Sequence, residues 1–202
     1  MKPDMKAFFE MRAATWDALH PPAQQAQAIA WGLGCAQQHF GPLKGKTLVD
    51  LGCGTGVLLP HLLAALGEGL LWAVDCAQAM VEAAKAKHVD ARLRFVCADA
   101  LRWAAPQGEA DGVLCYNSFP HFPREETLRA VASWLRPGGF FLIWHNFGRE
   151  KINSIHREAG GAVAKHRLMP AQALAALAEP CGFEAHSQTD DGQHWLVLLG
   201  KL

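Results

Sequence analysis

The chain has 202 residues, half of them hydrophobic, and its 19 Lys and Arg residues balance 19 Asp and Glu residues. This length and apolar content predict a single domain, residues 1–202, with a sizeable core. Balanced charge without blocks of like sign argues against nucleic-acid or membrane-surface binding. The apolar runs are too short to cross a bilayer, and Met1-Lys2-Pro3-Asp4 begins no secretory signal, so we expect a cytoplasmic protein.

Six cysteines are scattered along the chain, and no two of them form a C-x-x-C pair. Metal sites and redox-active disulfides favour closely spaced cysteines. We therefore expect reduced thiols that fill small apolar spaces.

The N-terminal region predicts two helices. Met5–His20 carries an apolar stripe with a polar edge and is stopped by Pro21-Pro22. The second helix is predicted over Ala23–Phe40. We expect residues 1–42 to form a helical cap.

A glycine-rich turn follows the first predicted strand, Thr47–Leu51. Gly52, Gly54 and Gly56 alternate directly after it, and an apolar stretch at helical spacing begins at Val57. Glycines allow positive φ and let a ligand approach the backbone closely. The amide groups at the start of the following helix favour a negative ligand group, so this turn predicts a small-molecule cofactor site.

The segment 49–56, Val-Asp-Leu-Gly-Cys-Gly-Thr-Gly, resembles motif I of the class I S-adenosylmethionine-dependent methyltransferases. The dinucleotide fingerprint of oxidoreductases needs a third glycine at the position of Val57, which disfavours that alternative. The resemblance implies that S-adenosyl-L-methionine is the cofactor. It also implies contacts at Asp50, Gly52, Cys53, Gly54 and Gly56.

The N-terminal tract Phe8-Phe9-Glu10…Trp16-Asp17 resembles the cap that lies over the cofactor in small-molecule methyltransferases. An aromatic ring beside a sulfonium would have a physical use, because the ring face attracts a cation. The resemblance therefore implies a cofactor contact at Trp16. An ordinary amphipathic helix that covers the sheet remains an equal alternative.

The second predicted strand, Gly69–Asp75, also ends on an acid. A right-handed crossover places it beside the first strand, where Asp75 could accept both hydroxyls of a ribose. We consider a purely structural role for Asp75, capping the next helix, the poorer interpretation. Cys76 and Met80 follow at the same edge, and Met80 could pack on an adenine or in the core.

The third predicted strand begins at Leu93 and leads to Asp99-Ala100. In the resembled family, the acid of such a pair receives the adenine amino group, and the next backbone N–H meets a ring nitrogen. Asp99 and Ala100 match this pattern. For Trp103, shortly after, we favour core packing over the adenine pocket.

The fourth predicted strand, Ala110–Tyr116, leads into Asn117-Ser118-Phe119-Pro120-His121. Polar residues at the carboxyl end of a buried strand mark the place where open α/β sheets hold ligands. The segment resembles motif IV of the small-molecule enzymes, which implies a cofactor contact at Tyr116. It lacks the N-P-P-Y of amino-methylating nucleic-acid enzymes.

A helix is predicted over Glu125–Leu135, followed by the turn Leu135-Arg136-Pro137-Gly138-Gly139 and a strand over Phe140–His145. This turn recurs across class I methyltransferases. Residues 146–169 depart from regular patterning, and we interpret them as a substrate lid.

Pro170 opens a helix over Ala171–Glu179, and a hairpin of Glu184–Thr189 and His194–Leu199 closes the chain. The last strand is expected to insert antiparallel into the sheet. The predicted fold is therefore α/β: a Rossmann-like, seven-stranded, mostly parallel sheet with helices on both faces and a C-terminal antiparallel hairpin strand.

Three histidines are candidate catalytic residues: His121 after the fourth strand, His145 at the end of the fifth, and His156 in the insertion. A neutral imidazole could deprotonate a thiol, phenol or enol near pH 7. Imidazoles with Glu150 or Glu158 could instead hold a zinc-like ion, but the histidine spacing matches no known ligand pattern, so we predict no metal.

The sequence thus predicts an S-adenosylmethionine-dependent methyltransferase acting on a small-molecule acceptor with an O, S or C nucleophile. A nucleotide-dependent oxidoreductase and a non-catalytic S-adenosylmethionine- or metal-binding protein remain as alternatives. Neither the acceptor nor the oligomeric state can be read from the sequence.

Overall fold

A computed structural model describes residues 3–202. The described chain forms a seven-stranded sheet in the order β3-β2-β1-β4-β5-β7-β6. Every neighbouring pair from β3 to β5 is parallel, and β7 inserts antiparallel between β5 and β6. The fold class predicted from the sequence is confirmed. Its strands are β1 (Thr47–Leu51), β2 (Leu70–Asp75), β3 (Leu93–Cys97), β4 (Ala110–Tyr116), β5 (Leu135–His145), β6 (Phe183–Asp190) and β7 (Trp195–Lys201).

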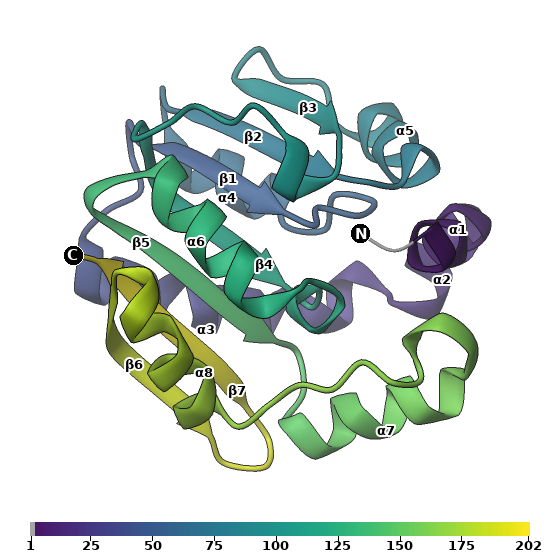
Figure 1. Ribbon diagram of the computed structural model, residues 1–202. Helices are drawn as coiled ribbons and strands as arrows, with labels where there is room; N and C mark the ends of the chain where they lie inside the picture. The colour runs from purple at the N-terminus through teal and green to yellow at the C-terminus, as the bar shows by residue number, and fades with distance from the viewer. Residues whose placement is uncertain (1–2) are drawn as a thin grey trace.

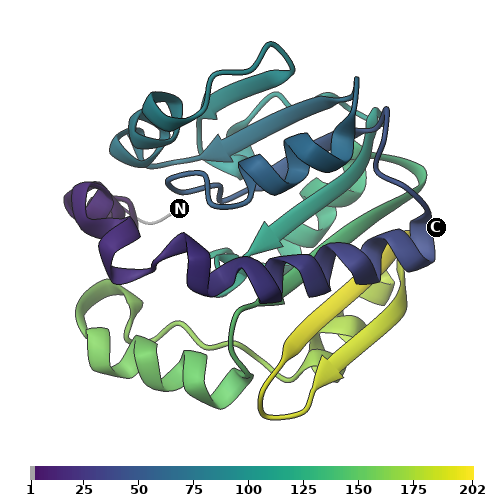
Figure 2. The ribbon, with the colours of Figure 1, turned by 180° about the vertical axis from the view of Figure 1, so that it is seen from behind.

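Helices cover both faces of this sheet. Figure 1 shows α6 and α8 in front of the sheet, and Figure 2 shows α3 and α4 on the opposite face. At the carboxyl ends of the parallel strands lie α1, α2, α5 and α7 (Figure 1). The helices are α1 (Pro3–Arg12), α2 (Trp16–Leu19), α3 (Pro22–Phe40), α4 (Leu59–Leu66), α5 (Gln78–Lys87), α6 (Arg124–Trp134), α7 (Arg149–Ala159) and α8 (Ala171–Ala178).

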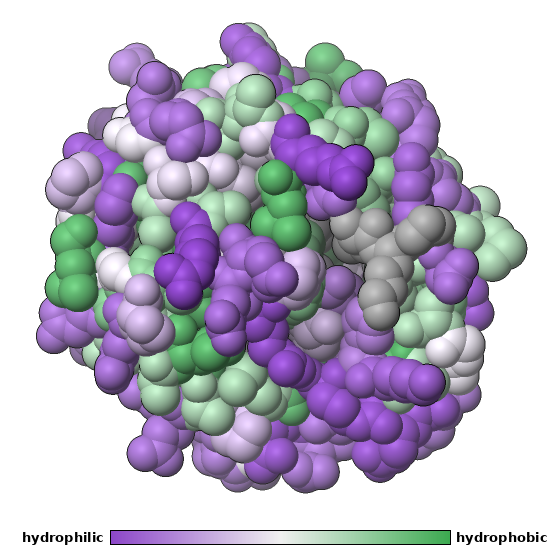
Figure 3. All heavy atoms as spheres, in the orientation of Figure 1, coloured by the Kyte–Doolittle hydropathy of each residue, from purple (hydrophilic) through white to green (hydrophobic). Residues whose placement is uncertain are grey.

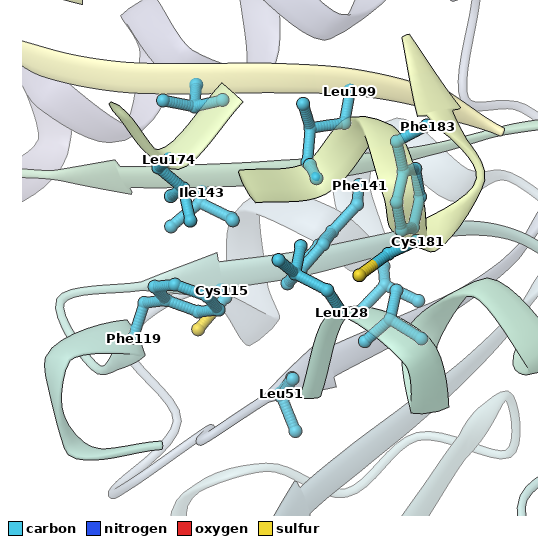
Figure 4. Close-up of a cluster of buried hydrophobic side chains, with 14 of the residues drawn as sticks. Leu51, Cys115, Phe119, Leu128, Phe141, Ile143, Leu174, Cys181, Phe183 and Leu199 are labelled. Atoms are coloured by element: carbon cyan, nitrogen blue, oxygen red, sulfur yellow. The ribbon is translucent and has the colours of Figure 1, made fainter. Parts of the chain in front are cut away.

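Alternation along the strands divides the core into two layers. In β5, Phe141 and Ile143 belong to the layer under α6 and α8, whereas Leu142 and Trp144 belong to the layer under α3 and α4. Successive side chains of a strand point to opposite faces, so a run of apolar residues fills both layers. Figure 4 shows the first layer, with Phe141, Ile143 and Leu199 of the sheet facing Leu128 of α6 and Leu174 of α8.

Three predicted elements differ from the structure. The predicted turn Leu135-Arg136-Pro137-Gly138-Gly139 forms the first part of β5, which begins at Leu135. The expected helix Met5–His20 is broken by a 3-10 turn at Ala13–Thr15. The insertion 146–169, expected to be irregular, contains α7. Its apolar face consists mainly of Ile152 and Ile155, and the buried Asn153 between them is polar, so the helical pattern is faint in the sequence.

The surface in Figure 3 is mostly hydrophilic, with hydrophobic residues scattered over it. Within residues 3–202, none of the helices is both long and apolar enough to cross a bilayer. All six cysteines are free thiols.

Close packing between α3 and β5 depends on Gly32. A Cβ atom there would lie 2.5 Å from Nε1 of the buried Trp144, whose N–H donates to the Ala28 carbonyl at 3.0 Å. Gly34, two positions beyond on the same helix, has no neighbouring atom within 4 Å of such a Cβ.

We therefore expect Gly32→Ala to lower the free energy of unfolding by about 1–3 kcal/mol through overpacking. The matched control Gly34→Ala should raise it by about 0.5–1 kcal/mol, since Ala favours a helix over Gly. Urea denaturation measures both values. Equal effects in the two variants would contradict this account of the packing.

A second stability prediction concerns Asp50 in β1. Its side chain is buried, Oδ2 has no hydrogen-bond partner among the described residues, and burial together with the nearby Asp75 raises its pKa to about 8. Below pH 3.8, its ordinary value, the carboxyl is protonated in both the folded and the unfolded chain. Between that pH and about 8 only the unfolded chain ionises, so the free energy of unfolding falls by about 1.4 kcal/mol per pH unit.

Asp50→Asn removes this ionisation. The variant should gain stability relative to the natural protein as the pH rises from 4 to 8, and the gain should level off above that range. Urea titrations at several pH values measure the difference. A difference that does not change with pH would show that Asp50 is ionised in the folded protein.

Candidate cofactor and acceptor cavity

A partly enclosed cavity of about 390 Å³ lies at the carboxyl ends of β1, β2, β4 and β5. The glycine turn and the strand ends form its floor, and residues of the N-terminal helices and of α7 form its sides. Open α/β sheets bind ligands at this edge, where neighbouring strands diverge. The predicted site residues that line it are Trp16, Gly52, Cys53, Gly54, Asp75, Cys76, Met80, Asp99, Ala100, Tyr116, His121, His145 and His156.

Two predicted contacts do not line the cavity. Asp50 is buried beneath the turn. At Gly56, a Cβ atom would meet His88 and Leu59 rather than open space. Both residues shape the turn from below, and the family resemblance could not distinguish this role from ligand contact.

The glycine turn has the backbone that the sequence predicts. Gly52, Gly54 and Gly56 all have positive φ, at 76°, 53° and 90°. A Cβ at Gly52 would lie 2.6 Å from the Ser118 hydroxyl, whereas one at Gly54 would meet no atom within 4 Å. Gly52 therefore allows the loop after β4 to approach, and Gly54 leaves the cavity open.

Asp75 joins the turn to the next helix. Its Oδ2 accepts a hydrogen bond from the Gly54 amide at 3.0 Å, and its Oδ1 accepts one from the Ala77 amide at 2.9 Å, directly before α5. Burial raises the pKa of this carboxyl, and the backbone donors partly offset that effect. The structural role that we considered the poorer interpretation is therefore present, and it coexists with a position on the cavity wall.

Asp99, Ala100 and Met80 also line the cavity. Asp99 accepts from the Leu101 amide at 3.2 Å, and Ala100 follows it on the cavity wall. Met80 is buried and packs with Ala13 and Ala77 of the surrounding elements. Trp103 does not line the cavity. It packs against the core between Trp72, in a tilted contact, and Trp134, in an edge-to-face contact, at ring-centroid distances of 5.7 and 5.3 Å.

Two acidic residues fasten the N-terminal segment to this edge. Both oxygens of Glu10 accept backbone hydrogen bonds at the start of α5, from Gln78 at 2.7 Å and Ala79 at 2.8 Å. Asp17 accepts from the Thr55 hydroxyl at 2.6 Å and pairs with Lys87 at 2.6 Å. Both residues belong to the resembled N-terminal tract, but these contacts were not expected, because an acid on the polar edge of a helix ordinarily points to solvent.

Asn117, also missed, holds the ends of three elements together. Its φ is 54°, a conformation that a non-glycine residue adopts at some energetic cost. Its Oδ1 accepts from the Asn146 amide at 2.9 Å, and its Nδ2 donates to the Gln25 side chain at 3.3 Å. These bonds tie β4 to the chain after β5 and to α3, and all three residues line the cavity.

The three candidate histidines meet at the other end of the cavity. His121 and His156 have ring centroids 4.9 Å apart. His145 is 2% exposed, packs edge-on against Trp195, and has no hydrogen-bond partner for either ring nitrogen among the described residues.

Burial keeps these imidazoles neutral. It lowers the pKa of His145 to about 3, with a further contribution from His156. It also lowers the pKa of His121 far below the usual range, with contributions from His156, His166 and His145. In the part of the chain that the structure describes, no three His, Cys, Asp or Glu side chains are arranged to hold a metal ion.

Comparisons with known proteins agree with this architecture. Residues 48–139 match the family model described as a methyltransferase domain. The 27-O-demethylrifamycin SV methyltransferase of Amycolatopsis mediterranei is 32% identical over 76% of this chain and 60% of its own length. The malonyl-[acyl-carrier protein] O-methyltransferase of Anoxybacillus flavithermus is 43% identical over 61% of this chain and 47% of its own length.

The chain thus spans about half the length of the curated relatives that it matches. A crystal structure of a SAM-dependent methyltransferase from Aquifex aeolicus superposes with a TM-score of 0.67 at 18% identity, covering 84% of this chain and 89% of that one, and supports the fold. Residues 48–139 therefore form a methyltransferase domain, and the similarity of the chain to these proteins supports the predicted class I S-adenosylmethionine-dependent methyltransferase family, whose cofactor is S-adenosylmethionine.

Proposed function

We propose that this protein transfers a methyl group from S-adenosylmethionine to an oxygen atom of a small-molecule acceptor. The observation that carries the proposal is one partly enclosed cavity with acids and glycines at one end and neutral imidazoles at the other. The printed names of the two curated relatives, which both describe methylation at oxygen, favour oxygen over sulfur or carbon.

The residues at the glycine end fit the proposed cofactor. Gly54 leaves open space beside the turn for the amino-acid part, and Asp75 retains free lone pairs for ribose hydroxyls. Asp99 and Ala100 would meet the adenine edge, and Trp16 and Met80 would cover the nucleoside. In this proposal, residues 1–42 form the cap over the cofactor.

The remaining end of the cavity would take the acceptor. Apart from its histidines, the charged side chains on the described cavity wall are Arg12, Asp17, Asp75 and Asp99. Asp17 is engaged by Thr55 and Lys87, and the other two acids lie at the glycine end. No carboxylate remains to stabilise an ammonium group, so an amine acceptor is disfavoured and a neutral or anionic oxygen compound fits better.

When bound, S-adenosylmethionine supplies an electrophilic methyl carbon with a neutral leaving group, so the protein has to hold the acceptor in line and exclude water. Phe9 and Ile155 wall the acceptor end, and residues 146–169 would serve as its lid. His121, His145 and His156 would contact the acceptor. Because burial disfavours an imidazolium on His145, we assign that ring to hydrogen bonding rather than to proton storage.

Incubation with methyl-labelled S-adenosylmethionine and four probe acceptors tests the function: caffeic acid, octanoic acid, dithiothreitol and ethanolamine. Label should appear in an oxygen acceptor and not in the amine. Transfer of the label only to the nitrogen of ethanolamine or to a sulfur of dithiothreitol would contradict the oxygen assignment. Tight cofactor binding without transfer to any probe would favour the non-catalytic alternative.

Asp75→Ala should weaken binding of S-adenosylhomocysteine by about 1–3 kcal/mol, the scale for losing hydrogen bonds to a charged group. Isothermal titration calorimetry measures the change. Asp75→Asn keeps one side-chain oxygen that can accept a backbone hydrogen bond. Comparing its affinity with that of Asp75→Ala therefore separates loss of the ligand contact from loss of support for the turn.

Asp191→Ala, at the exposed β6–β7 turn, is the matched control and should leave the affinity unchanged. Unchanged affinity in a folded Asp75→Ala variant would disprove the ribose contact.

A further inference from the structure

A pair of histidines connects the cavity with an open groove on the surface. His121 lines the partly enclosed cavity, and His166 lines the groove beside the start of α6. Their Nδ1 atoms are 3.2 Å apart, which is hydrogen-bonding distance, and their ring centroids are 5.2 Å apart. The two imidazoles therefore connect the cavity with the groove.

The loop that carries His166 is fixed from two sides. The Nδ1–H of His156 donates to the His166 carbonyl at 2.8 Å. Asn153 of α7 donates to the Leu168 carbonyl at 3.1 Å and accepts from the Leu168 amide at 2.8 Å. From α6, Arg124 donates to the Arg167 carbonyl at 2.7 Å. His166 is thus held against His121 by bonds to its own backbone and to those of its neighbours.

The hydrogen bonds determine which ring nitrogens of these histidines carry protons. A carbonyl only accepts, so His156 carries its proton on Nδ1 and, when neutral, has a lone pair on Nε2. In the bond between His121 and His166, one Nδ1 donates and the other accepts. A proton can therefore pass between these two rings.

We propose that His121 and His166 form a relay that carries the acceptor's proton out of the cavity, and that the acceptor is a hydroxyl compound that is still protonated at neutral pH. This inference rests on the proposed function and extends it.

The acceptor oxygen gains the methyl group as the sulfur–carbon bond breaks, and its O–H proton moves to Nε2 of His121. The Nδ1 proton of His121 moves to Nδ1 of His166, and the Nε2 proton of His166 passes to water in the groove.

Each ring thereby gains one proton and loses one, and the net result is the release of a single proton to solvent. His121 contacts the acceptor in this scheme, whereas His166 acts through His121. The low pKa of His121 supports transfer through the ring rather than storage on it, because a buried imidazolium beside His145 and His156 is unfavourable.

The groove is a suitable exit. Its wall contains Arg124, Lys165 and Arg167 together with the carboxylates of Glu125 and Glu126, and it opens to solvent. The pairing could not be anticipated from the sequence, because 45 positions separate the two histidines.

The kinetic test uses His166→Gln, which keeps a polar side chain but cannot relay a proton, and His166→Ala, with caffeic acid and octanoic acid as probes. We expect kcat for caffeic acid to fall about tenfold or more in dilute buffer with little change in KM. Added imidazole should restore the rate of the alanine variant. Methylation of octanoate, which carries no proton at pH 7, should be unaffected.

His39→Ala, which removes an exposed histidine, controls for unspecific effects of imidazole. Folding of each variant is checked by circular dichroism. Unchanged kcat for caffeic acid in both His166 variants, or equal losses for the two probes, would overturn the relay.

A second measurement does not depend on turnover, and it separates failure of the relay from failure of the proposed function. Nitrogen-15 NMR of the histidine rings should show one protonated and one unprotonated Nδ1 in the His121–His166 pair. The His121 Nδ1 signal should shift in His166→Gln. Two unprotonated Nδ1 atoms in the natural protein would overturn the relay even if methyl transfer is observed.

Discussion

Burial of both faces of the sheet is the constraint on which the remaining structure depends. Apolar side chains of β5 alternate between the two core layers, and helices cover each layer. Polar groups are costly in such layers, so chemistry is concentrated where the strands end. The ends of β1, β2, β4 and β5 supply the turn, Asp75, Asn117 and His145 to a single cavity.

Concentrating polar groups in this way places two carboxyls, those of Asp50 and Asp75, close together in a buried site. Each raises the electrostatic cost of ionising its neighbour. The structure compensates them differently: Asp75 receives backbone hydrogen bonds from Gly54 and Ala77, whereas Oδ2 of Asp50 has no partner among the described residues. The strand pattern places an acid near the end of both β1 and β2, but the neighbouring backbone decides how many hydrogen bonds each one accepts.

Local patterns in the sequence were sufficient for the sheet, the glycine turn and most helices, because strand alternation and helix stops are properties of adjacent residues. They were insufficient for α7, whose apolar face is narrow, and for the break after Arg12. In the site, acids and histidines at strand ends could be anticipated. The contacts of Glu10 with α5 and of His121 with His166 could not, since they join segments distant in the sequence.

Polar contacts attach the N-terminal segment to the edge of the sheet. Glu10 and the Asp17–Lys87 pair hold this segment against the sheet edge through partly exposed polar contacts, each of which contributes about 1 kcal/mol or less. Such contacts break and re-form far more readily than the packed layers beneath them. Exposed charges therefore help to hold the N-terminal segment beside the glycine turn. Dissolved salt screens such charges and weakens this attachment, while the apolar packing of the sheet is unaffected.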